Sequence, residues 1–174
     1  MKNKKIVAWV LIIVGLFSFL WLTGKHRTIT QKSNKVIEAE NQSLSMENGL
    51  VVSETLYDFG TISMRDGNVS KIFKITNNTN EDMLFTSLIT SCMCTDAYFI
   101  RQDGSKKGPF GMEGMGFMPK LNETIKAGHS VDIEVVYDPN AHGPAGVGMI
   151  DRFVELKNIK GDKLQLEIKA NVTP

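Results

Sequence analysis

This sequence has a small net charge and few cysteines. The 174 residues carry a formal net charge of only +1, and the chain has two cysteines. A nucleic-acid-binding chain needs a concentrated basic face to neutralise phosphates, so the near-neutral balance argues against a nucleic-acid partner. Two cysteines are also too few for the disulfide framework of a small secreted scaffold.

Several familiar catalytic motifs are missing as well. The sequence contains no Gly-x-Ser-x-Gly nucleophile elbow and no phosphate-binding loop, each of which places a reactive group by a defined local geometry. No internal repeat is visible, and no amphipathic helix is predicted after residue 50. A nucleophile built from a cysteine and a histidine stays open on composition alone. We nevertheless expect a binding protein rather than an enzyme.

Charge is also absent from an N-terminal run, Ile6–Thr23, which follows three lysines and has a tryptophan near each end. About 18 apolar residues suffice for a bilayer-spanning helix, and tryptophan favours the two interfaces. The run lacks a small-residue cleavage pattern, so residues 1–24 are predicted to be an uncleaved membrane anchor, with a cleaved signal sequence as the alternative. Basic residues flank both ends, so the charge count alone does not decide the orientation.

After this run the sequence changes character twice. Residues 25–50 are polar and are predicted to be a linker, whereas residues 51–174 show the alternation of apolar and polar residues that is typical of half-buried strands. Strands are predicted at Leu56–Ile62, Val69–Thr76, Met83–Thr90, Ala97–Ile100, Val131–Tyr137, Phe153–Leu156 and Leu164–Val172. About seven short strands separated by turn signals predict an all-β fold, an immunoglobulin-like antiparallel β-sandwich preceded by one transmembrane helix.

The two cysteines, Cys92 and Cys94, are one residue apart at the end of a predicted strand. On an extended strand, residues i and i+2 point to the same face, and two adjacent thiolates make half of a site for a soft metal such as Cu(I) or Zn. Two other interpretations stay open. The pair can form a disulfide, which an oxidising compartment outside the membrane favours, or two buried thiols that pack as small apolar groups.

Soft metal ligands recur in two later loops. Met112, Met115 and Met118 are three residues apart in a glycine-rich stretch; thioether sulfur suits Cu(I), although methionine also fills apolar gaps. His142 lies on a proline-flanked loop, where it is either a ligand or a turn-capping residue, and loops at one end of a sandwich cluster. His129 is predicted to be a turn residue. The predicted ligands, for a metal that we expect to be Cu(I), are Cys92, Cys94, Met112, Met115 and His142.

Five motifs in order resemble one known family. They are Asp58-Phe59-Gly60-Thr61-Ile62, Phe73-x-Ile75-x-Asn77, Ser91-Cys92-x-Cys94-Thr95, Ile125-x-x-Gly128 and Val136-Tyr137-Asp138-Pro139. Together they resemble domain of unknown function 1573, over roughly residues 51–174. The resemblance implies a bacterial, extracytoplasmic, immunoglobulin-like domain similar to Hydin-like sandwiches, and it therefore favours a cytoplasmic N-terminus. The family usually has glycine between the cysteines, where this chain has Met93, and the methionine loop and the His142 loop are additions. The resemblance implies no biochemical activity.

These observations predict a membrane-anchored domain, periplasmic or on the cell surface, that binds copper or a similar soft metal. Its role would be to deliver the metal to another envelope protein or to sequester it. The alternative is a non-catalytic assembly or adhesion module that accepts a partner strand at a sheet edge, with structural or redox cysteines. A thiol oxidoreductase ranks last, because no helix N-terminus is predicted beside the cysteines to activate a thiol.

Overall fold

The computed structural model describes residues 44–45, 49–116 and 119–174. All of them belong to one compact unit, Glu40–Pro174. The predicted membrane anchor at residues 1–24 lies outside the described residues, as does most of the predicted linker. Within the described part of the chain, no helix has the length and apolarity needed to cross a membrane.

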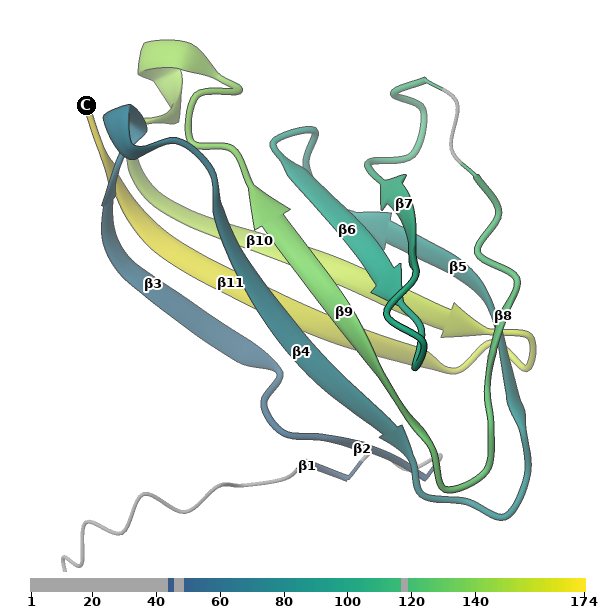
Figure 1. Cartoon of the computed structure of the whole chain (residues 1–174). Coiled ribbons are helices and arrows are strands. Elements are labelled where there is room, and N and C mark those ends of the chain that lie inside the picture. Colours follow the sequence, from purple (N-terminus) through teal and green to yellow (C-terminus); the bar gives the residue numbers. More distant parts are fainter. Residues whose placement is uncertain (1–43, 46–48, 117–118) are drawn as a thin grey trace, which may run out of the picture. The chain divides into compact units, whose positions relative to one another are not determined.

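Two β-sheets enclose one hydrophobic core (Figure 1). The six-stranded sheet has the order β1 (Leu44–Ser45), β2 (Leu50–Val52), β4 (Val69–Asn77), β9 (Ser130–Tyr137), β6 (Thr95–Ile100), β7 (Lys106–Phe110). The five-stranded sheet has the order β3 (Leu56–Ser63), β11 (Lys163–Thr173), β10 (Gly148–Asn158), β5 (Met83–Thr90), β8 (Glu123–Ile125). Two 3-10 helices, η1 (Met64–Asp66) and η2 (Gly143–Gly146), lie in connections. The predicted all-β sandwich is confirmed.

The core follows from the period-two pattern of the long strands. In β9, Val131, Ile133, Val135 and Tyr137 are at most 7% exposed, while the residues between them are half-buried. Successive side chains of a strand point to opposite faces, so this alternation places one apolar face of β9 in the core. Each large apolar side chain buried in this way contributes about 1.5–3 kcal/mol relative to exposure.

The number and direction of the strands differ from the sequence-based prediction. About seven antiparallel strands were expected, but β1, β2, β7 and β8 are additional strands of five residues or fewer, too short for an alternating pattern to reveal. β7 lies after Ile100, between two of the predicted strands, and it pairs with β6 in a hairpin. One pair of strands is parallel: β3 runs beside β11 in the same direction, with Leu56 opposite Glu167.

A bulge in β5 decides which of its side chains enter the core. The register with β10 shifts between Lys157 and Asn158, so that Phe85 and Leu88 are both buried although they are three residues apart. An extra residue in one strand reverses the faces beyond it. After the bulge, Leu88 and Thr90 point inward, and the chain leaves β5 on the core side, at the cysteines.

Candidate metal centre

The two cysteines lie in a tight turn that carries the chain from one sheet to the other. β5 belongs to the five-stranded sheet and β6 to the six-stranded sheet, and residues 91–94 connect them. The backbone N–H of Thr95 donates to the carbonyl of Cys92 over 3.1 Å, and the hydroxyl of Thr90 donates to the same carbonyl over 3.0 Å. The prediction of an extended strand at Cys92 and Cys94 is therefore wrong, because the chain must turn here to change sheets.

The turn still places the two sulfur atoms side by side. Cys92 and Cys94 are joined in a disulfide, with their Cα atoms 5.2 Å apart. Cys94 is only 2% exposed, whereas Cys92 is half-buried. The structure thus holds the oxidised pair, one of the interpretations that the sequence left open. Because the thiolate is the metal ligand, metal binding by these residues requires the reduced pair.

His142 reaches the sulfur atoms from the loop that follows β9. Its Nε2 lies 3.2 Å from the Sγ of Cys92. The loop is held to the cysteine turn by the backbone N–H of Asp138, which donates to the carbonyl of Cys94 over 2.9 Å. The side chain of Asp138 accepts from the N–H of Asn140, and the Asn140 amide donates to the carbonyl of Met64. These bonds fix the loop, so that an exposed histidine is aimed at the sulfur atoms.

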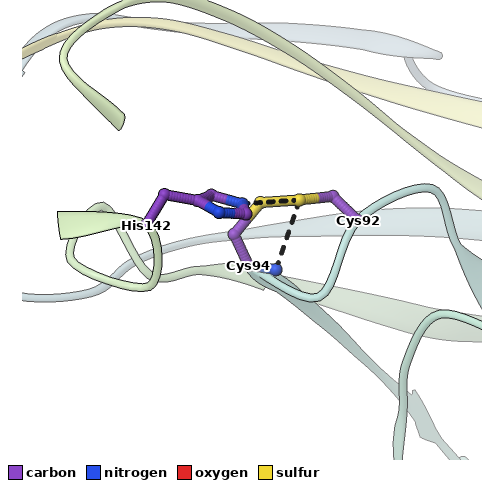
Figure 2. A group of neighbouring side chains, drawn as sticks. All are labelled: Cys92, Cys94 and His142. Atoms are coloured by element: carbon purple, nitrogen blue, oxygen red, sulfur yellow. Dashed lines mark hydrogen bonds between the residues drawn. A yellow bond between two sulfur atoms is a disulfide. The ribbon is translucent and has the colours of Figure 1, made fainter. Parts of the chain in front are cut away.

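Cys92, Cys94 and His142 together form a group of donor atoms that fits a metal ion. Their Sγ and imidazole nitrogen atoms all lie within 4.8 Å of one another. Figure 2 shows the imidazole and the two sulfur atoms gathered at one place between the turn and the loop. Two ligands each about 2.0–2.3 Å from a shared ion lie within about 4.6 Å of each other, so the three donor atoms are near enough to share an ion once the disulfide is reduced and its sulfur atoms separate. The structure brings together these three of the five predicted ligands.

Arg152 is a fourth side chain at this place, and sequence reasoning missed it. Its Nε donates to the Sγ of Cys94 over 3.2 Å. In β10 the buried residues Ile150 and Val154 flank it at spacing two, so Arg152 is on the inward-facing side of the strand. A charged residue at an inward position of an alternating strand was the signal that could have identified it.

Negative charge is disfavoured at the end of the sandwich where Arg152 lies. Burial raises the pKa of Tyr137, with Asp138 raising it further and Arg152 opposing both. Burial and the nearby Asp138 also raise the pKa of Asp96. This end of the sandwich therefore disfavours additional negative charge, and Arg152 is the cation positioned to offset it at Cys94.

The methionine loop starts beside the cysteine turn and then leads outward. Met112 forms an isolated parallel bridge with Thr90, and the N–H of Thr90 donates to the carbonyl of Gly111 over 3.0 Å. Met115 is 54% exposed, and Met118 lies outside the described residues. The roles of Met112 and Met115 as ligands stay predictions.

His129 is placed as the sequence indicates. Its Nδ1 lies 2.8 Å from the carbonyl oxygen of Ala127, in the turn before β9 that contains Gly128, whose φ is 72°. A left-handed φ of this kind favours glycine. His129 therefore belongs to a turn, at the opposite end of β9 from His142.

Comparison with protein families supports the resemblance over the first three of the five motifs. Residues 50–108 match the family described as protein of unknown function (DUF1573). This segment includes β2 to β6 and the cysteine turn. The chain thus carries a DUF1573 family domain over residues 50–108. No curated protein matches the chain.

Solved structures show the fold and little more. A protein of unknown function from Porphyromonas gingivalis W83 aligns with a TM-score of 0.51 and 16% identity, covering 73% of this chain and 50% of its own. The secreted serine protease VesC from Vibrio cholerae aligns at 0.47 and 13% identity, over 75% of this chain and 25% of its own. An ASH / PapD-like domain of human CEP192 aligns at 0.43 and 10% identity, over 85% and 97%. The chain thus spans half or less of the two bacterial proteins.

Proposed function

We propose that the reduced form of this domain binds Cu(I) through Cys92, Cys94 and His142. The observation that carries the proposal is the convergence of two sulfur atoms and an imidazole nitrogen within 4.8 Å. Thiolate is a soft ligand that selects Cu(I) and Zn, and imidazole suits both. Three donors of this kind leave a position for a further ligand or for a partner that accepts the metal.

Charge balance favours Cu(I) over Zn at this site. Two thiolates and one Cu(I) carry a net charge of −1, and the guanidinium of Arg152, 3.2 Å from the Sγ of Cys94, brings the sum to zero. Zn²⁺ with the same thiolates is already neutral, so that the site with Zn²⁺ has no negative charge of its own for Arg152 to offset. Met112 and Met115 are proposed as additional ligands, because thioether sulfur is soft and suits Cu(I).

The proposed setting is the outer side of a membrane. The uncharged run Ile6–Thr23 supports a single N-terminal anchor, and the DUF1573 resemblance supports an extracytoplasmic domain. We propose that the domain delivers copper to another envelope protein or sequesters it there, without catalysis of its own. The exposed position of His142 supports transfer, because an incoming protein could replace that ligand.

Strand addition by an assembly or adhesion partner is less well supported. Among the described strands, the four at sheet edges are β1, β7, β3 and β8. β1 and β8 have two and three residues, and β7 contains Pro109. β3 is longer, but its register is interrupted between Asp58 and Thr61. Short strands, proline and bulges are the features by which proteins protect edges from pairing.

The proposal is tested by titration of the full chain with Cu(I) after reduction, without oxygen, against a chromophoric Cu(I) chelator. We expect the wild-type chain to remove Cu(I) from the chelator. The variant Cys92→Ser/Cys94→Ser should not, and His142→Asn should lower the affinity at least about tenfold, since even supporting residues of a metal site cost that much.

His129→Asn is the matched control, because it removes an imidazole that is bonded to a turn carbonyl at the other end of β9. The Cu(I) affinity of this variant should equal that of the wild type. Equal binding by the double cysteine variant and the wild type would overturn the proposal. Equal binding by His142→Asn would remove His142 from the ligand set. Titration with Zn²⁺ in parallel tests the preference derived from Arg152.

A further inference from the structure

The two sulfur atoms of the disulfide differ in access. Cys94 is 2% exposed, next to the core, whereas Cys92 is half-buried and borders the exposed residues Ser91 and Met93. A thiolate that opens a disulfide approaches one sulfur atom and expels the other. Access therefore directs an external thiolate to the Sγ of Cys92.

The two sulfur atoms also differ in their hydrogen-bond donors. The Sγ of Cys94 accepts from the Nε of Arg152 over 3.2 Å, a charged donor. The Sγ of Cys92 accepts from the backbone N–H of Cys94 over 3.4 Å and lies 3.2 Å from the Nε2 of His142, and neither group has the fixed positive charge of a guanidinium. Hydrogen bonds from charged groups are roughly twice as strong as neutral ones. A negative charge that develops on the sulfur of Cys94 is therefore better stabilised than one on Cys92.

From these two asymmetries we infer that the domain undergoes thiol–disulfide exchange with a dithiol partner in a fixed direction, with Cys92 attacked and Cys94 expelled. One thiolate of the partner attacks the Sγ of Cys92. A mixed disulfide forms with Cys92, the Cys92–Cys94 bond breaks, and its electron pair leaves on the Sγ of Cys94 beside Arg152.

The second thiolate of the partner then attacks the partner's own sulfur in the mixed disulfide and expels Cys92 as a thiolate. The partner dithiol is oxidised to a disulfide, and the Cys92–Cys94 pair is reduced by the same two electrons. Protons on the partner thiols pass to solvent or to the two cysteines. In this direction the exchange produces the dithiolate that the proposed copper site needs. The exchange itself concerns the metal-free pair, so its tests contain no metal, and they can succeed or fail separately from the copper titration.

The first test compares the two single-cysteine variants of the full chain. Cys94→Ala leaves Cys92 as a free thiol, and Cys92→Ala leaves Cys94. Each is reacted with dithiodipyridine, an uncharged disulfide whose release of thiopyridone is followed by absorbance. We expect Cys92 to react at least about tenfold faster than Cys94, because reaction requires access to the sulfur. Equal rates, or a faster Cys94, would overturn the direction of exchange.

The second test isolates the role of Arg152 as a positioning residue for the leaving sulfur. The wild-type disulfide is reduced with dithiothreitol, quenched by alkylation at intervals, and the free thiols are counted by mass spectrometry. Arg152→Met should slow reduction by about three- to tenfold, because the rate depends on how well the leaving thiolate is stabilised. Arg152→Lys, which keeps the charge, should restore most of the rate.

Arg65→Met is the matched control for this second test, since Arg65 is an exposed arginine on η1. It should reduce at the wild-type rate. A rate for Arg152→Met that equals or exceeds that of the wild type would show that the guanidinium does not assist the departure of Cys94, and the inference would fail. Circular dichroism of each variant establishes that the comparison is between folded chains.

Discussion

The two ends of the sandwich handle their polar groups in opposite ways. β9 connects them: Ser130 at its start pairs with Thr76, next to Asn77, and Tyr137 at its end pairs with Thr95, next to Cys94. Its eight residues span about 23 Å at the usual rise of a strand. One end is therefore the Asn77 end and the other the cysteine end, on the same scaffold.

At the Asn77 end, the polar side chain is buried and fully bonded. Asn77 has no exposed surface, and its amide nitrogen donates to the carbonyls of Glu81 and Ile125, over 2.7 and 3.0 Å. Its amide oxygen accepts from the N–H and the hydroxyl of Thr79. An asparagine side chain has two donors and two acceptor sites, so the capacity of Asn77 is used up inside the fold.

At the cysteine end, the reactive side chains can still form bonds to a partner from outside. Among the described residues, the ring of His142 has a single hydrogen-bond partner, the Sγ of Cys92, and it is exposed. The Sγ atoms of Cys92 and Cys94 are joined in a disulfide, which reduction opens. The difference teaches that a saturated buried polar group stabilises the fold, whereas an unsaturated group at the rim is available for binding or exchange.

The largest expected effect breaks the Asn77 end. Asn77→Ala removes four hydrogen bonds, including the one to the buried carbonyl of Ile125, and a buried polar group left without its partner costs about 1–3 kcal/mol. We expect the free energy of unfolding to fall by about 3 kcal/mol, measured by urea denaturation of the full chain. Asn80→Ala, an exposed residue of the same turn, is the control. A loss below about 1 kcal/mol would contradict the structural role of Asn77.

A smaller effect is expected at the cysteine end. The disulfide closes a loop with a sequence separation of only 2, and a disulfide stabilises a protein less when the loop that it closes is shorter. Cys92→Ala/Cys94→Ala should therefore lower the free energy of unfolding by about 1.5 kcal/mol. If the loss exceeds that of Asn77→Ala in the same urea experiment, the cysteines stabilise the fold and the comparison between the two ends is wrong.

Glu123 on β8 extends the saturated behaviour to an ion pair. Arg101 holds it with two bonds of 2.6 and 2.8 Å, and Lys107 with one of 3.0 Å. The hydrogen bonds from Arg101, followed by that from Lys107, hold the pKa of Glu123 below its ordinary value, against an opposing contribution from burial. Lys107 also donates to the carbonyl of Leu121.

A lowered folded-state pKa gives stability that is present above the unfolded value, about 4.3, and is lost as the pH falls through the folded value. We expect Glu123→Gln to cost about 1 kcal/mol at pH 7, because partly exposed pairs are screened. The wild type should approach the variant in unfolding free energy as the pH falls towards about 3. Glu113 is an exposed carboxylate of the methionine loop, and Glu113→Gln should leave the pH profile of the unfolding free energy unchanged. If this profile for Glu123→Gln runs parallel to that of the wild type, Glu123 is not the source of the pH-dependent stability.

Sequence reasoning succeeded where a pattern is local. The alternation of β9 identifies the core face residue by residue, and the same is true of β11. It did not reveal β8, whose three residues are too few for alternation, or the bulge that reorients β5. These features depend on the partner strand, and no local property of the residues encodes it.

The candidate site shows the same division. The donor chemistry of Cys92, Cys94 and His142 was readable from residue types, because the chain has only two cysteines and three histidines. Their proximity depends on a turn between sheets meeting the loop after β9, which spacing in the sequence cannot show. The contact of Arg152 with Cys94 likewise requires β10 to lie beside the cysteine turn, which spacing in the sequence does not show either.

The smallest expected effect on stability is at His142, and it sharpens the comparison most. The side chain is exposed and precedes η2 without a side-chain capping bond, so His142→Asn should change the free energy of unfolding by no more than about 0.5 kcal/mol. Cu(I) binding by the same protein should weaken at least about tenfold. Urea denaturation of the oxidised chain and Cu(I) titration of the reduced chain measure the two effects separately. A loss of stability above about 1.5 kcal/mol with unchanged Cu(I) affinity would make His142 a structural residue like Asn77, and the two ends of the sandwich would no longer differ in kind.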